Sequence, residues 1–227
     1  IKVKGNFISY EAGGSGAAYL AWSGKSPELE EQVREVAQRF FRDQKRSPEG
    51  LITSNHVKDS LAQVFIDVAF AVSPFLLYSG LKENNNAYVD LAVFETLELF
   101  KILEDKNTGL LHQARGFNGW GNLTEDNWSR GNGWGAFALA VLARDLPETH
   151  PKYKEVAECA KKYFSSVLRF QDRNGMWHQE MSDSTSYVET SGTGLLLYGI
   201  GIMIEKGILP KEFKKNVELG LKGYLTY

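Results

Sequence analysis

The segment Trp128–Trp134, WSRGNGW, places Arg130 between two tryptophans, with two glycines beside it. A guanidinium is a planar cation that pairs through two hydrogen bonds with a carboxylate, and aromatic faces hold it flat. The segment opens an apolar helical pattern, and the amino end of a helix attracts anions through its backbone donors, which we expect the glycines to free. Arg130 is therefore a candidate carboxylate-binding residue, unless it pairs with Glu125 or Asp126 in a structural loop.

Asp67 lies in the segment FIDVAFAVSPFLL, which is otherwise almost entirely apolar. A carboxylate buried there without a partner would cost several kcal/mol or have its pKa raised until it stays protonated. A carboxylic acid that is protonated near neutral pH can act as a general acid. The alternative is that Asp67 begins a helix and caps its backbone N–H groups. Both interpretations are compatible with the spacing.

Two histidines, His112 in GLLHQ and His178 in GMWHQ, occupy equivalent places in a repeated pattern. The equivalence favours a structural role, such as closing a turn through a hydrogen bond, over catalysis. No histidine pair has the spacing of a metal site, and we expect neither a metal nor another cofactor. Glu189, in SYVETS, is expected to cap a helix.

The elements that must position these residues form a repeat with a period of roughly 60 residues. Helices apolar on all sides are predicted within 13–24, 66–81, 131–146 and 189–209, and amphipathic helices within 33–44, 94–105 and 163–172. A helix that is apolar all round lies inside a protein, and one with a charged face lies outside. Each amphipathic helix ends at a turn with a glycine, Gly50, Gly109 or Gly175, suited to a left-handed backbone.

Hairpins of this kind stack side by side, so that inner helices shield one another and outer helices cover them. The long loops all occur at one point of the repeat and must gather at one end, as a groove in a linear solenoid or a cup in a closed ring. We predict an all-α toroid of about four hairpins, forming one domain over residues 1–227. If the ring requires six hairpins, this one is incomplete.

Composition limits the partners. Basic and acidic residues number 26 and 28, with no basic stripe to bind nucleic acid, and no apolar run approaches the length of a membrane span. The single cysteine excludes an internal disulfide and leaves the compartment, cytoplasm or periplasm, undecided. Aromatic residues make up 12% of the chain, which fits sugar-stacking surfaces as well as a large core.

Four segments come in an order that resembles glycoside hydrolase families 88 and 105, the bacterial unsaturated glucuronyl and rhamnogalacturonyl hydrolases. They are FIDVAFAVSPFLLYSGL, KNTGLLHQARG, WSRGNGW and GMWHQEMSDSTSYVETSGTGLLLYGI, and the resemblance covers about residues 60–207. It implies an (α/α)6 barrel with the active site in its cup. It also implies an acidic oligosaccharide substrate that begins with a Δ4,5-unsaturated uronic acid, as polysaccharide lyases leave it.

The resemblance places the family's catalytic aspartate at Asp67. In the family this acid protonates C4 of the vinyl ether and then activates water for attack at C5, so a second carboxylate is not obligatory as in ordinary glycosidases. The predicted substrate-binding residues are His112, Trp128, Arg130, Trp134, His178 and Glu11.

Two departures from the family pattern leave other functions open. Family members usually carry a second aspartate on the preceding inner helix, where the nearest acid here is Glu11, and Val68 replaces the acid that follows the catalytic one. The protein could instead cleave saturated glucuronides with two carboxylates, Asp67 plus Glu11 or Glu189. It could also be a helical-repeat carbohydrate-binding protein without catalysis. Oligomeric state and polysaccharide are not determined by the sequence.

Overall fold

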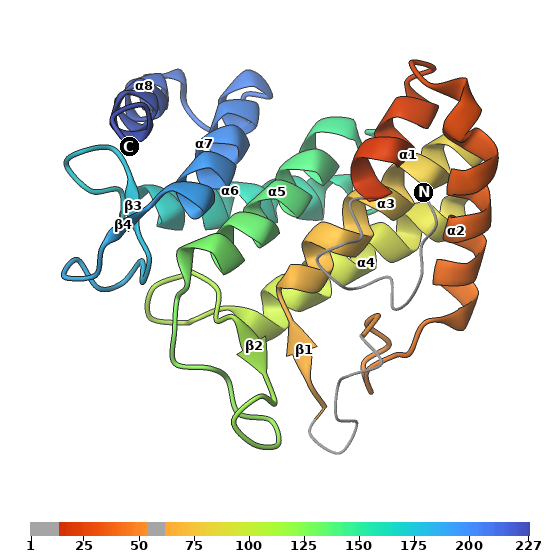
Figure 1. Cartoon of the computed structure of the whole chain (residues 1–227), viewed down its shortest axis with the longest axis horizontal. Coiled ribbons are helices and arrows are strands. Elements are labelled where there is room, and N and C mark those ends of the chain that lie inside the picture. Colours follow the sequence, from red (N-terminus) through yellow and green to blue (C-terminus); the bar gives the residue numbers. More distant parts are fainter. Residues whose placement is uncertain (1–13, 54–61) are drawn as a thin grey trace.

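The computed structural model of the chain describes residues 14–53 and 62–227, and within these ranges it consists mainly of α-helices arranged as four antiparallel hairpins (Figure 1). The hairpins are α1–α2, α3–α4, α5–α6 and α7–α8. The helices span Gly14–Trp22 (α1), Glu30–Asp43 (α2), Asp67–Glu83 (α3), Asn86–Leu103 (α4), Ser129–Asp145 (α5), Tyr153–Leu168 (α6), Thr190–Glu205 (α7) and Lys214–Tyr224 (α8). Short 3-10 turns, Pro27–Leu29 and Lys211–Phe213, precede α2 and α8.

The predicted division into inner and outer helices is confirmed. The inner helices pack in the order α1, α3, α5, α7, and α2, α4, α6 and α8 each cover the inner helix of their own hairpin, so the hairpins form a row (Figure 1). In α5 only a few side chains keep solvent exposure, whereas α2 and α6 bury one stripe and expose charged residues on the other side. None of the described helices combines the length and the apolar character that crossing a lipid bilayer requires.

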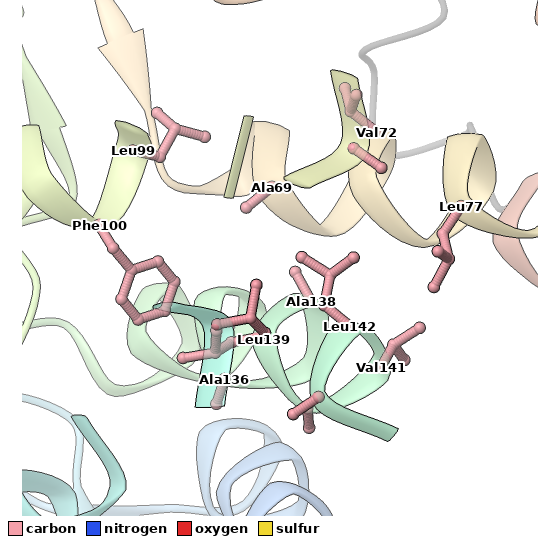
Figure 2. Close-up of a cluster of buried hydrophobic side chains, with 14 of the residues drawn as sticks. Ala69, Val72, Leu77, Leu99, Phe100, Ala136, Ala138, Leu139, Val141 and Leu142 are labelled. Atoms are coloured by element: carbon pink, nitrogen blue, oxygen red, sulfur yellow. The ribbon is translucent and has the colours of Figure 1, made fainter. Parts of the chain in front are cut away.

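The core lies between the inner row and the outer row. Figure 2 shows part of it, where Leu139 of α5 lies near Phe100 of α4. These side chains are almost completely buried, and each contributes about 1.5–3 kcal/mol through loss of contact with water. Because the core runs continuously through the hairpins, it fixes the amino ends of neighbouring inner helices relative to one another.

Glycines close the turns after the outer helices, as predicted. Gly50, Gly109 and Gly175 have φ angles of 94°, 71° and 86°, the left-handed region that a residue with a Cβ atom rarely adopts. At Gly175 a Cβ atom would also lie 2.5 Å from the carbonyl oxygen of Leu219 in α8. Gly175 therefore permits both the left-handed backbone conformation of the turn and the close packing of α8 against it.

Two small antiparallel sheets tie the long loops together, and the sequence pattern did not predict them. Val64–Phe65 (β1) pairs with Ala114–Arg115 (β2), and Trp177–His178 (β3) pairs with Val188–Glu189 (β4). In Figure 1 the first sheet lies at the lower edge and the second at the left, next to the start of α7. The strand β1 leads directly into α3, so the first sheet positions the start of that helix.

The buried carboxyl group of Glu95 is expected to make the stability of the fold depend on pH. Glu95 of α4 is 0% exposed, accepts a hydrogen bond of 2.7 Å from the N–H group of Ile52, and lies 3.6 Å from the guanidinium of Arg46. Burial raises the pKa of Glu95 to about 8, against the smaller opposing effects of Ile52 and Arg46. The folded protein therefore binds this proton more tightly than the unfolded chain, and stability is lost as the pH rises from about 4.5 to 8.

We expect Glu95→Gln, which keeps the acceptor but has no charge, to unfold at a higher temperature than the wild type at pH 8. The two proteins should converge near pH 5. Thermal unfolding followed by circular dichroism across this range measures the difference, with Glu98→Gln on the exposed side of the same helix as control. A temperature difference that does not change with pH would show that Glu95 does not titrate in this way.

Candidate active site

The amino ends of the inner helices α3 and α5 place Asp67 and Arg130 in equivalent positions of neighbouring repeats. The N–H group of Ile66 donates to the carbonyl of Gln113 over 3.0 Å, and that of Ser129 donates to the carbonyl of Gln179 over 2.9 Å. Asp67 and Arg130 directly follow these two donors. The start of each of these inner helices is thus hydrogen-bonded to the loop of the next repeat. The residue after the bonded N–H group is Asp67 in α3 and Arg130 in α5.

Both residues lie on the accessible face of their helices. On α5, Arg130, Trp134 and Phe137 are half-buried at helical spacing, while their neighbours on the other sides of this part of the helix are buried. On α3, Asp67 and Phe70 hold the corresponding positions. The rings of Phe70 and Trp134 are 4.3 Å apart between centroids and join the two faces into one surface. Asp67 and Arg130 therefore lie one helical turn from this contact, on the same side of the bundle.

The glycines beside Arg130 serve close packing, and the expectation that they free backbone donors stays a prediction. Both lie inside α5. A Cβ atom at Gly131 would come within 3.3 Å of Ile66, and one at Gly133 within 2.9 Å of Leu195 in α7. The absence of Cβ atoms lets α3 and α7 approach the first turn of α5, which draws the ends of the inner helices together.

The Arg130 guanidinium stacks on a single indole. Its central carbon lies 4.4 Å from the centroid of the Trp128 ring, while Trp134 packs against Phe70 instead. The expected position between two tryptophans is therefore wrong. Arg130 makes no hydrogen bond or ion pair with any residue in the described part of the chain, so the alternative pairing with Glu125 or Asp126 is also wrong. The structure thus presents a flat cation whose hydrogen-bonding positions are available to a ligand.

Trp134 and His112 contribute further polar atoms. Trp134 Nε1 and His112 Nδ1 are both buried, and neither has a hydrogen-bond partner among the described residues. A buried polar atom without a hydrogen bond lowers the stability of the fold by about 1–3 kcal/mol. Such atoms are therefore uncommon, and a functional role is one reason for them. The main chain at His112 is fixed, because the Asn132 side chain of α5 bonds the N–H and carbonyl groups of Leu111, each over 2.9 Å. The main chain that carries His112 is therefore held in one conformation.

His178 differs from its repeat equivalent. Its Nδ1 atom forms a hydrogen bond with the carbonyl of Ser186, and its Nε2 atom lies 3.8 Å from the carboxylate of Asp172. Both partners belong to the loops on either side of the β3 strand. The Nδ1 contact supports the structural interpretation of His178, but its Nε2 atom, like Nδ1 of His112, is buried without a hydrogen-bond partner among the described residues.

Asp67 is the first residue of α3, and the N-cap position belongs to Ile66, whose side chain makes no capping hydrogen bond. Its Oδ2 atom is buried. The next residue, Val68, is buried in the core, so the position that carries a second acid in the resembling families points away from the accessible face. Asp67 is the only carboxylate of α3 at this end of the helix.

Two further acids near the site, Glu180 and Glu189, accept hydrogen bonds from backbone N–H groups. Both carboxylate oxygens of Glu180 accept the N–H group of Asn127, at 2.7 and 3.0 Å, which secures the loop before Trp128. Glu189 is the N-cap of α7, as predicted. Burial raises the pKa of Glu189, but hydrogen bonds from Ser191, Gly192 and Ser129 outweigh burial and hold the pKa below its usual value. Glu189 therefore stays ionised and is a poor proton donor.

The family assignment agrees with this geometry. The sequence model of Glycosyl Hydrolase Family 88 matches residues 12–227, almost the whole chain. The chain belongs to Glycosyl Hydrolase Family 88. Its members are glycoside hydrolases, and the resemblance drawn from the sequence motifs is confirmed.

Individual curated relatives are similar to part of this chain. The unsaturated rhamnogalacturonyl hydrolase YesR of Bacillus subtilis is 26% identical over 168 residues, 72% of this chain and 48% of that protein. An unsaturated 3S-rhamnoglycuronyl hydrolase of an Alteromonas species is 33% identical over 92 residues, 40% of this chain and 22% of that protein. The family 88 chain therefore spans at most about half the length of these curated relatives.

Solved structures confirm the fold. A possible member of the GH105 family from Salmonella enterica superimposes with a TM-score of 0.87 and 22% identity, covering 100% of this chain and 60% of that one. The unsaturated glucuronyl hydrolase of Bacillus sp. GL1 gives a TM-score of 0.71 and 18% identity, covering 95% of this chain and 60% of that one. The four hairpins of this family 88 chain are thus part of an α/α-barrel fold.

One predicted site residue lies outside the described residues. Glu11, the candidate second acid, falls there. Within the described residues no group of three His, Cys, Asp or Glu side chains is arranged to hold a metal ion. Within the described residues the candidate site thus comprises Asp67, His112, Arg130 and Trp134, with Trp128 supporting the arginine.

The N-cap at Glu189 gives a stability prediction. We expect Glu189→Ala to lower the free energy of unfolding by about 1 kcal/mol, because the first turn of α7 loses the acceptor for two backbone N–H groups. Urea unfolding at pH 7 measures the change, and Glu125→Ala, on the exposed loop before Trp128, is the matched control. Equal midpoints for Glu189→Ala and the control would contradict the capping role.

Proposed function

We propose that the protein is a glycoside hydrolase that releases a terminal Δ4,5-unsaturated uronic acid from lyase-generated oligosaccharides. The observation that carries the proposal is the Arg130 guanidinium, stacked on Trp128 and without a protein partner in the described residues, on the same accessible surface as Asp67. A guanidinium fork suits the carboxylate of a uronide. The curated relatives are named for unsaturated rhamnogalacturonyl and rhamnoglycuronyl substrates, which supports the same substrate class.

The chemistry needs one carboxyl group in two protonation states. Asp67 as the acid donates its proton to C4 of the vinyl ether, and positive charge develops at C5 and the ring oxygen. The Asp67 carboxylate then takes a proton from the water that attacks C5, which restores the acid. The resulting hemiketal opens to a ketone at C5, and the hemiacetal at C1 releases the remaining sugar chain as an alcohol. The sum of these steps is the addition of one water molecule.

The other described residues have roles that follow from their atoms. Arg130 binds the uronide carboxylate next to C5 and orients the double bond toward Asp67. Trp134 Nε1 donates to a sugar oxygen, and His112 Nδ1 exchanges a hydrogen bond with a second one, which satisfies two buried atoms that have no described partner. Trp128 holds the guanidinium flat, which preserves the bidentate geometry.

A glycosidase that cleaves saturated glucuronides is the second candidate, and it needs a second carboxylate. Glu189 does not fit, because its carboxylate caps α7 and its pKa lies below the usual value. Glu11 lies outside the described residues. The single acid at the amino end of α3, and an arginine without a partner among the described residues, favour the hydration route.

The experiment is an ultraviolet assay with unsaturated disaccharides from lyase-digested pectin, glycosaminoglycan and ulvan, beside a saturated aryl glucuronide. Hydration removes the conjugated double bond, so we expect absorbance to fall with at least one unsaturated substrate and no release of the aryl group. Aryl release without loss of absorbance would establish the saturated glycosidase. Calorimetric binding of the disaccharides without any turnover would indicate a carbohydrate-binding protein.

A further inference from the structure

Two large aromatic side chains stand in solvent on the loop that joins β2 to α5. Trp120 is 74% exposed and Phe117 is 61% exposed. Aromatic side chains contribute most when they pack against another apolar face, and these two make little use of their surface inside the described chain. Residues 116–124, which contain both, include no charged side chain.

The loop is held in one conformation. The N–H group of Gly116 donates to the carbonyl of Asn122 over 2.7 Å, and that of Asn122 donates to the carbonyl of Gly119 over 3.3 Å. Gly119 and Gly121, on either side of Trp120, have φ angles of 127° and 71°, which a residue with a Cβ atom rarely adopts. The turn thus places Trp120 at its tip in a preorganised position, which reduces the entropy lost on binding.

The loop is also connected to the proposed site. The Phe117 ring packs edge-to-face on Phe65, with 6.2 Å between centroids, and Phe65 is the β1 residue two positions before Asp67. The N–H group of Thr124 donates to the carbonyl of Ala114 over 2.9 Å, which closes the base of the loop onto the same sheet. The loop and Asp67 are therefore joined through one short sheet.

We propose that Phe117 and Trp120 form a stacking platform for neutral sugar rings that follow the terminal uronide toward the reducing end. The inference rests on the proposed function, because the uronide at Asp67 and Arg130 fixes where the rest of the oligosaccharide leaves the proposed site. The C–H faces of a pyranose pack on aromatic rings, and a loop without charged side chains suits a neutral ring better than a second uronate. The platform makes the enzyme prefer longer oligosaccharides over disaccharides.

The test compares kcat/KM for an unsaturated disaccharide and an unsaturated tetrasaccharide with neutral internal sugars. Trp120→Ala is expected to lower the value for the tetrasaccharide about tenfold, mainly through KM, and to change the disaccharide value less than about twofold. Phe117→Ala should act in the same direction, and Trp120→Phe should retain most of the preference. Tyr227→Ala, at a residue that is 75% exposed, is the control and should behave as the wild type.

Binding separates this inference from the proposed function. Calorimetry with the two oligosaccharides on Asp67→Asn, and on Asp67→Asn combined with Trp120→Ala, measures the affinity ratio without turnover. If the wild type hydrolyses neither substrate but Trp120→Ala still lowers the tetrasaccharide affinity, the proposed function fails and the platform stands. An unchanged ratio in both assays overturns the platform, and so does a change of oligomeric state in Trp120→Ala without a change of ratio.

Discussion

Replacing Asp67 with asparagine is expected to lower kcat on an unsaturated uronyl disaccharide by about 10³-fold, with little change in KM. Asparagine has nearly the same shape but can neither give a proton to C4 nor take one from water, and general acid–base catalysis contributes about 10²–10⁴-fold. Because Asp67 is not the N-cap of α3, the melting temperature should remain close to that of the wild type. The initial rate of absorbance loss, measured over a range of substrate concentrations, provides both constants.

A matched control is Asp90→Asn, which removes an exposed carboxylate from the outer helix α4. It should leave both constants unchanged. If Asp67→Asn retained a rate within about tenfold of the wild type, Asp67 would not be the acid, and another carboxyl group would have to be sought.

Replacing Arg130 is expected to have the second large effect on catalysis. We expect Arg130→Ala to reduce kcat/KM for the unsaturated uronide by about 10²–10³-fold, because truncating one partner of a desolvated, hydrogen-bonded charge pair costs about 2–5 kcal/mol. Arg130→Lys should recover only part of this loss, because an ammonium group has no planar fork to match a carboxylate and does not stack as a guanidinium does on Trp128.

A modified substrate tests whether Arg130 binds the uronide carboxylate. With an unsaturated disaccharide whose uronide carboxylate is esterified, the wild type and Arg130→Ala should differ by less than about threefold, because the charge that Arg130 recognises is absent. Arg39→Ala, at an exposed position of α2, is the control for loss of a positive charge. A full-size effect of Arg130→Ala on the ester would show that the guanidinium does not bind the carboxylate.

The helical framework could be predicted because its pattern is local. The all-round apolar segments that became α3, α5 and α7, and the turn glycines such as Gly109, are each visible within a few consecutive residues. The common place of the long loops in the repeat then predicted that Asp67 and Arg130 share one end. These predictions depend only on periodicity and on the shape of a helical hairpin.

Other features depend on contacts between distant segments. Strands of two residues, such as Val64–Phe65, are too short to show an alternating pattern. The hydrogen bonds of Asn132 to Leu111 and of Glu180 to Asn127 join residues 21 and 53 positions apart, and no local pattern indicates such pairs. The stacking of Arg130 on a single indole also depends on a contact between distant segments, because Trp134 packs against Phe70 of α3 instead.

The most direct test of the account is a crystal structure of Asp67→Asn with an unsaturated oligosaccharide bound. The account predicts that the uronide carboxylate forms two hydrogen bonds with Arg130, and that C4 of the same ring lies about 3–3.5 Å from the side chain of residue 67. A uronide bound with its carboxylate away from Arg130, or with C4 beyond reach of residue 67, would contradict the account.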